Sequence, residues 1–181
     1  QLQSMMNPMT SWFDIVVFII LKVVKNFKEL VSADRQFRQD TLLIGSQVQN
    51  IDNIVAKLGP EFEKLGGSFE TASKSAGAIF SEFQSTLMVT KENVKFVGDM
   101  ATNLGVSEAE AAGVLATFRQ MGVSNLDNVK SLQEQATLLA TQSGVAPGQI
   151  MQDIAKASGE AAGYFRGNTT ELIKSAVFAR K

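Results

Sequence analysis

Residues 27–58 read FKELVSADRQFRQDTLLIGSQVQNIDNIVAKL, and the spacing of their apolar side chains sets the expected architecture. Large apolar residues recur at alternating steps of three and four, which is the heptad pattern of a helix that buries one stripe against partner helices. The same ladder begins at Phe13 and continues to Phe83. The ten positions of the predicted oligomer seam are Phe27, Leu30, Asp34, Phe37, Thr41, Ile44, Val48, Ile51, Val55 and Leu58.

A single helix over residues 13–58 would be about 70 Å long at about 1.5 Å per residue. The seam mixes Ile and Val with Phe, and such large side chains suit three or more strands better than two. Asp34 and Thr41 are polar seam positions, which either fix the register of the bundle or mark the place where it opens. We therefore predict a homo-oligomer, a trimer or higher, built from copies of this helix.

Two pairs of helix-breaking residues interrupt the ladder. Proline disfavours the α conformation in the residue before it, so we expect a helix to end at Leu58-Gly59 and the next to begin at Pro60. Gly66-Gly67 predicts a second break.

The N-terminal segment is the most apolar part of the chain. Its uncharged run, residues 15–21, is seven residues long and is bracketed by Asp14 and Lys22. A membrane-spanning helix needs about 20 apolar residues, so this run is too short to span a bilayer. Two interpretations stay open: the segment is buried in the core of an oligomer, or it meets a membrane at some stage.

A Gly-Val step recurs three times in the second half, at Gly105-Val106, Gly122-Val123 and Gly144-Val145. Glycine closes a helix in the left-handed conformation, and the following valine packs back on the last turn. Ser107 then caps the next helix, and Glu110 completes a capping box. These signals predict antiparallel helices joined by tight turns, and they disfavour a regular solenoid. The expected helices are 91–104, 108–121, 126–143, 148–162 and 170–181.

The expected fold class is therefore all-α: a long heptad coiled-coil helix followed by short antiparallel helical hairpins. The chain divides into an apolar N-terminal segment (1–25), a coiled-coil oligomerisation region (26–85) and a helical hairpin region (90–181). The expected core of the hairpin region comprises Phe96, Met100, Leu104, Val114, Leu115, Phe118, Leu132, Leu138, Leu139, Ile150, Ile154, Phe165, Ile173 and Phe178.

The amino-acid composition excludes several kinds of catalytic and metal-binding site. The 181 residues include no histidine and no cysteine, which excludes disulfides, thiol nucleophiles, serine–histidine triads and zinc sites with nitrogen or sulfur ligands. The net charge of −1 comes without a visible basic patch, so no sequence-specific contact with nucleic acid is expected. Glu108 and Glu110 fit the charged first turn of a helix better than an acid–base pair. We predict no catalytic, cofactor-binding or metal site, and no enzymatic activity.

Three stretches of the second half carry a resemblance to a known family. Over residues 83–181 the chain resembles the tail tape measure proteins of bacteriophages and of related contractile injection systems. The residues behind this resemblance are Leu104-Gly105-Val106-Ser107 with Ala111, Phe118 with Met121-Gly122-Val123-Ser124, and Ala140-Thr141-Gln142-Ser143-Gly144-Val145-Ala146-Pro147-Gly148-Gln149-Ile150-Met151 with Asp153-Ile154-Ala155.

The resemblance implies a structural role in the virion tail. Several copies would lie in the lumen of the tail tube, where their length would set the length of the tube, and one end would dock on the baseplate hub. The protein would leave ahead of the genome at ejection and would make a transient contact with the host membrane, in the cell envelope. Tube and hub proteins would be its partners, and this sequence would be a fragment of a longer chain. Gly-broken hairpins fit a place near the hub, or a released state, better than a narrow tube.

Two other interpretations stay open. The first is a membrane-active helical protein, either pore-forming or an injected effector, for which leakage of liposomes would be the sign. The second is a coiled-coil signalling or secretion-needle component, which would have neighbours other than tube and baseplate proteins.

Overall fold

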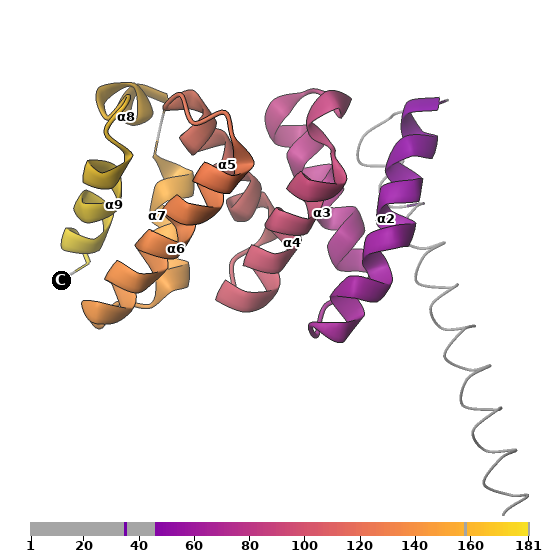
Figure 1. Cartoon of the computed structure of the whole chain (residues 1–181), viewed down its shortest axis with the longest axis horizontal. Coiled ribbons are helices and arrows are strands. Elements are labelled where there is room, and N and C mark those ends of the chain that lie inside the picture. Colours follow the sequence, from indigo (N-terminus) through magenta and orange to yellow (C-terminus); the bar gives the residue numbers. More distant parts are fainter. Residues whose placement is uncertain (1–34, 36–45, 158, 181) are drawn as a thin grey trace, which may run out of the picture.

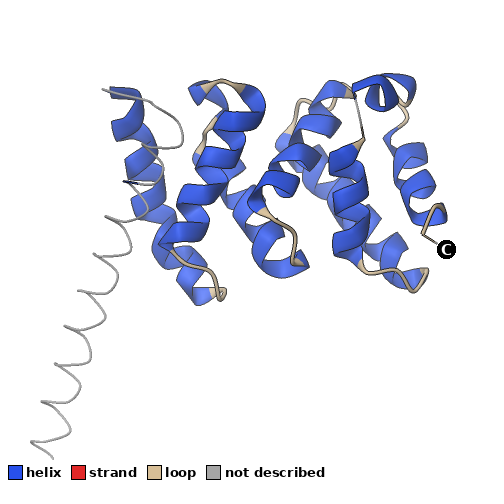
Figure 2. Cartoon of the chain, turned by 180° about the vertical axis from the view of Figure 1, so that it is seen from behind, coloured by secondary structure: helices blue, strands red, loops and turns tan. Residues whose placement is uncertain are grey.

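The computed structural model describes residue 35 and residues 46–157 and 159–180. These residues form eight α-helices and one 3-10 helix, and the described part of the chain contains no strand, so the all-α prediction is confirmed (Figure 1; Figure 2). The elements are α2 (Ser46–Lys64), α3 (Phe69–Phe83), η1 (Thr86–Met88), α4 (Lys91–Leu104), α5 (Glu108–Gln120), α6 (Leu126–Gln142), α7 (Pro147–Lys156), α8 (Gly159–Tyr164) and α9 (Thr169–Phe178).

The helices stand side by side in a row that runs from α2 at one end to α9 at the other (Figure 1). Consecutive helices pair as hairpins, such as α2 with α3, α4 with α5 and α6 with α7, while α3 also contacts α5, and α5 contacts α7. The hairpins thus stack along the row in layers, and they differ in length. The helices α2 and α3 pack against α4 and α5, so residues 46–85 and the hairpin region share one body.

Helix α5 lies at the centre of this body. Eight consecutive residues, from Ala111 to Phe118, are buried, and α5 contacts α3, α4, α7 and α8. Small side chains allow this close approach, since Gly113 lies directly against Ala155 of α7. The hydroxyl of Thr117, which is buried, donates a hydrogen bond of 3.1 Å to the carbonyl oxygen of Ile154. A helix surrounded on all sides therefore ties both halves of the stack together.

The long coiled-coil helix is not seen among the described residues, where the longest helix is α2 with 19 residues. The predicted break at Leu58-Gly59 is wrong, because α2 runs through Gly59 and Pro60 to Lys64. Gly59 is buried beneath the ring of Phe69, and a side chain there would overlap that ring. The glycine thus serves close packing between α2 and α3, while Pro60 places its ring on the exposed face. The break at Gly66-Gly67 is confirmed, with Gly66 at a φ of 88°.

The three Gly-Val steps form the predicted turns. Gly105, Gly122 and Gly144 have φ angles of 67°, 96° and 73°, in the left-handed region that favours glycine. Val106 is buried, and Val123 and Val145 pack against the core. Helix α4 has the predicted bounds, and the helices predicted at 108–121 and 126–143 each end one residue early.

Other local predictions need correction. The third residue of the Gly122-Val123-Ser124 turn does not cap the next helix as Ser107 does: the cap of α6 is Asn125, whose side chain accepts a hydrogen bond from the Asp127 amide. The expected helix at 148–162 is two helices, α7 and α8, because Ala157 leaves the helical conformation with a ψ of 111°. Leu138 and Phe178 are 59% and 81% exposed and do not belong to the core.

Candidate functional site

The predicted oligomer seam divides between described and undescribed residues. Ile51, Val55 and Leu58 are buried within the chain's own core, where α2 packs against α3 and α4. These three positions are therefore occupied by intramolecular contacts. Val48 lies in α2, but its side chain is outside what the structure describes. The remaining six positions, Phe27, Leu30, Asp34, Phe37, Thr41 and Ile44, lie outside the described residues.

The acidic pair at the start of α5 is a helix cap. The backbone N–H and the hydroxyl of Ser107 both donate to Oε2 of Glu110 at 2.9 Å, and the Glu110 amide donates to the Ser107 hydroxyl oxygen at 3.2 Å. The hydrogen bond from the Ser107 backbone holds the pKa of Glu110 below its ordinary value. This is the predicted capping box, and its carboxylate is committed to the helix end.

The described residues contain no cluster of three or more acidic side chains placed to hold a metal ion. The helices of the described part also include none that is both long and apolar enough to cross a membrane. The described part of the chain also has hollows between its helices, where another molecule or segment could bind.

The first hollow is a groove between α4 and α6, with a volume of about 290 Å³. Phe96, Met100 and Leu104 recur every four residues along α4 and form its apolar side, since residues four apart share one face of a helix. Gln133 lines it from α6. Small-molecule sites usually measure about 300–1,000 Å³, so this groove lies at the lower end of that range.

The charges of this groove are unevenly paired. Lys95 on α4 lies 3.4 Å from Asp99 and 3.7 Å from Glu61, and Lys130 on α6 lies 3.7 Å from Asp127. Glu92 on α4 and Glu134 on α6 also line the groove. Neither of them forms an ion pair within the described part of the chain. Two carboxylates without an ion pair in the described part of the chain thus line the groove, with Glu92 in line with the apolar strip on α4, one turn before Phe96, and Glu134 on α6.

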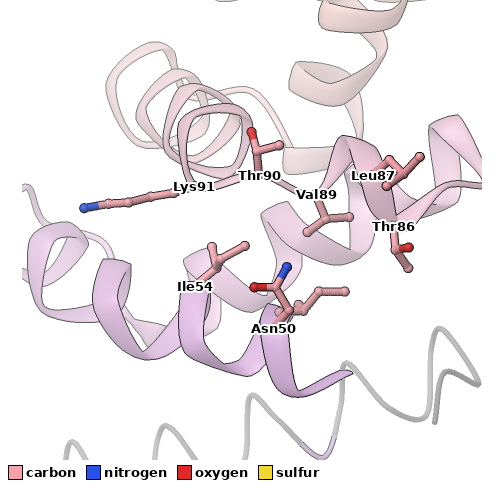
Figure 3. A pocket seen from close by; sticks show the side chains of 8 residues that line it. Asn50, Ile54, Thr86, Leu87, Val89, Thr90 and Lys91 are labelled. Atoms are coloured by element: carbon pink, nitrogen blue, oxygen red, sulfur yellow. The ribbon is translucent and has the colours of Figure 1, made fainter. Parts of the chain in front are cut away.

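A second hollow of about 520 Å³ lies beside the first turns of α2. Asn50 and Ile54 on α2 face Val89 across it, and the Lys91 side chain extends away from the hollow (Figure 3). Nζ of Lys91, the charged group among the lining residues, pairs with Glu61 at 3.1 Å, so the lining carries no unpaired charge. Leu87, at its rim, is 86% exposed.

The C-terminal end of the row is held by a partly exposed ion pair between Arg180 and Asp153. At the C-terminal end, Nε and Nη2 of Arg180 donate to the two carboxylate oxygens of Asp153, both at 2.7 Å. The hydrogen bonds from Arg180 hold the pKa of Asp153 below its ordinary value. This bidentate pair fastens Arg180, the second residue after α9, to α7, while Tyr164 and Phe178 stay largely exposed.

The sequence did not predict either hollow. The spacing of Phe96, Met100 and Leu104 indicated only a core face, and nothing local shows that α6 stands opposite that face. Comparisons with known proteins identify no relative: no protein-family model, curated protein or solved structure matches the chain.

Proposed function

We propose that this chain is a structural, non-catalytic tail protein of the tape measure type, which assembles as a homo-oligomer through its N-terminal heptad helix. Its place is the virion tail, in the lumen of the tube or at the baseplate hub, and its partners are the tube and hub proteins. It sets tail length during assembly and leaves the tail at genome ejection.

The observation that best supports this proposal is the role of the Gly-Val steps. Gly105, Gly122 and Gly144, which carry the resemblance, close the successive hairpins from α4 to α7. In each Gly-Val step the glycine forms the turn and the valine packs in or against the core. We expect such a role for the recurring motif of a structural protein. The stacked hairpins form a body several helices wide (Figure 1). We therefore place residues 46–180 near the hub, and the heptad helix in the tube.

Tail length is the direct test. An insertion of four heptads between Leu30 and Val31 keeps the register and adds about 42 Å of helix at about 1.5 Å per residue. We expect electron micrographs of particles that carry this variant to show tails longer by that amount. A deletion of two heptads should shorten them by about half as much. Assembled tails of unchanged length in both variants would contradict the proposal.

Oligomerisation tests the seam separately. The full chain should have the mass of a trimer or higher oligomer in light scattering. Changing Phe27 and Phe37 to Asp should lower that mass, because charged residues do not fit an apolar seam. The matched control changes Lys28 and Arg38, the next residues along the helix, to Asp and should keep the oligomer. Equal effects of the two double variants would argue against the seam.

A further inference from the structure

The described helices divide into two groups at the middle of the row. Helices α2, α3, α4 and α5 pack together in one group, and α6, α7 and α9 pack together in the other. Among the helices that the structure describes, the extensive contacts that cross between the groups are those of α5 with α7 and with α8. A single helix therefore carries most of the junction between the two halves.

The contact between α5 and α7 passes through small residues. Gly113 of α5 lies against Ala155 of α7. In the first turn of α7, Gly148 lies against the carbonyl oxygen of Leu104, where α4 ends. Interlocking side chains set the crossing angle of two packed helices, and glycine and alanine supply few such obstacles at these two points. Packed helices can slide or rotate slightly while they stay in contact, so this line is suited to be an axis of motion.

The side chains that border the groove between α4 and α6 bond within their own group. Lys95 of α4 pairs with Asp99 at 3.4 Å, whereas Lys130 of α6 pairs at 3.7 Å with an aspartate in the first turn of the same helix. Nε2 of Gln133 donates at 3.1 Å to a hydroxyl on α6 itself. In the part of the chain that the structure describes, no hydrogen bond or ion pair joins α4 to α6. A change in the width of this groove therefore breaks none of these bonds.

We propose that the row bends at this junction: α6, α7 and α9 rotate as one body about the line where α5 meets α7, and the groove between α4 and α6 widens and narrows. The hydrogen bond from Thr117 to the Ile154 carbonyl oxygen lies on this line, so it persists as the row bends. Asn103 and Glu134 at the groove are polar and exposed, so they stay hydrated at either width. The bend belongs to the folded chain and does not depend on the function proposed above.

Distances between pairs of spin labels test the bend, because the natural chain has no cysteine that would compete for labelling. Asn53→Cys on α2 and Ser175→Cys on α9 place labels at exposed positions in different halves. The matched control pairs lie within one half each: Asn53 with Asn103 on α4, and Ser131 on α6 with Ser175, all at exposed positions. The full chain is labelled and diluted with excess unlabelled chain, so that only distances within one molecule are measured.

We expect the distance distribution between Asn53 and Ser175 to be wider than that of either control pair by more than about 2 Å, the usual scale of a hinge rearrangement. The control pairs should both stay narrow, because each half moves as a body. A distribution for Asn53 and Ser175 as narrow as the controls would overturn the proposal. Equal widening of all three pairs would also overturn it, because the motion would then not be confined to the junction.

A wedge in the groove gives a second readout. Gln133→Trp adds bulk on the α6 side of the groove, and a junction that rotates should accommodate it by opening. The mean distance between Asn53 and Ser175 should then lengthen by more than about 2 Å, while the distances within each half stay the same. Gln135→Trp, at an exposed position on α6 that does not line the groove, is the matched control and should shift no distance.

The same shift in both tryptophan variants, or no shift in a folded Gln133→Trp chain, would count against rotation at the junction. Should Gln133→Trp fail to fold, the widths measured with the three label pairs decide the question without it.

Discussion

The N-terminal hairpin and the C-terminal end of the row are stabilised by different means. In α2 and α3, aromatic rings lie on glycines: Phe69 covers Gly59, and Phe62 covers Gly98 of α4. At the other end, α9 is held by three buried apolar residues and by the exposed pair of Arg180 with Asp153. Contacts that exclude water contribute far more than exposed ion pairs. The comparison therefore predicts that substitutions at the N-terminal hairpin act on the whole fold, whereas those at the C-terminal end act locally.

Removing the ring of Phe62 should have the largest effect. The side chain is 0% exposed, and truncation of a buried phenylalanine to alanine typically costs about 3–5 kcal/mol. We expect Phe62→Ala to lower the free energy of unfolding in urea by that amount. Leu65→Ala, three residues along the chain at a site that is 47% exposed, is the control. A similar loss in both variants would mean that the close packing is not what matters.

Gly98→Ala tests the same contact from the other side. The added Cβ would overlap the Phe62 ring, and overpacking of this kind costs about 1–3 kcal/mol. Combining it with Phe62→Leu should cost less than the sum of the two single changes, because the smaller side chain makes room. Additive losses in urea unfolding would show that the two sites do not touch in solution.

Between the two ends, the cap of α5 should have an intermediate effect. Ser107→Ala removes the hydroxyl from the capping box and should lower the free energy of unfolding by about 0.5–2 kcal/mol. Ser124→Ala is the matched control, since the cap of α6 is Asn125. A larger effect at Ser124 than at Ser107 would contradict the cap assignment.

Acid should weaken the fold through the same cap and through the C-terminal pair. The pKa values of Glu110 and Asp153 are lowered from ordinary values of 4.5 and 3.8. A carboxyl group with a lowered folded pKa stabilises the protein above its unfolded pKa, and this contribution is lost as the pH falls through the folded value. We expect the urea concentration at the unfolding midpoint to decrease when the pH is lowered below about 4. This decrease should be smaller in Glu110→Gln, which has no carboxyl group at this position to protonate. An equal fall in that variant would exclude Glu110 as a source.

Asp153→Asn should have the smallest global effect. It removes the charge that Arg180 binds, at a site where both side chains are partly exposed. Amide hydrogens of α9 should exchange faster, while those of α5 keep their rates, because local opening at an end does not require global unfolding. Faster exchange throughout the molecule would mean that the C-terminal end supports the whole stack.

The sequence predicted best what depends on neighbouring residues. Left-handed glycines such as Gly105 and the capping box of Ser107 are local, and both are found as predicted. Pro60 was misread because tertiary contacts of Leu58 and Phe62 keep α2 helical on both sides of it. Leu138 was misread because α6 packs through Val129, Leu132, Ala136 and Ala140.

The groove residues were beyond prediction for another reason. Phe96 on α4 and Gln133 on α6 are far apart in the sequence, and their placement depends on how the intervening helix α5 seats both hairpins. Local propensity carries no information on such a juxtaposition. The predicted seam shows a related problem, because the same apolar pattern suits packing against another copy or packing within one chain. Ile51 and Val55 were predicted to contact other copies, but they are buried in the core of their own chain.

The central position of α5 has a mechanical consequence. In a row of hairpins, each helix is held mainly by its neighbours, so tension applied at the two chain ends peels the row from its ends inward. We expect α9 to detach first, because few buried residues and one exposed charge pair hold it, and α5 to yield last. A chain drawn out through a narrow channel would then unravel in steps of one or two helices, and the residues from Ala111 to Phe118 would resist longest.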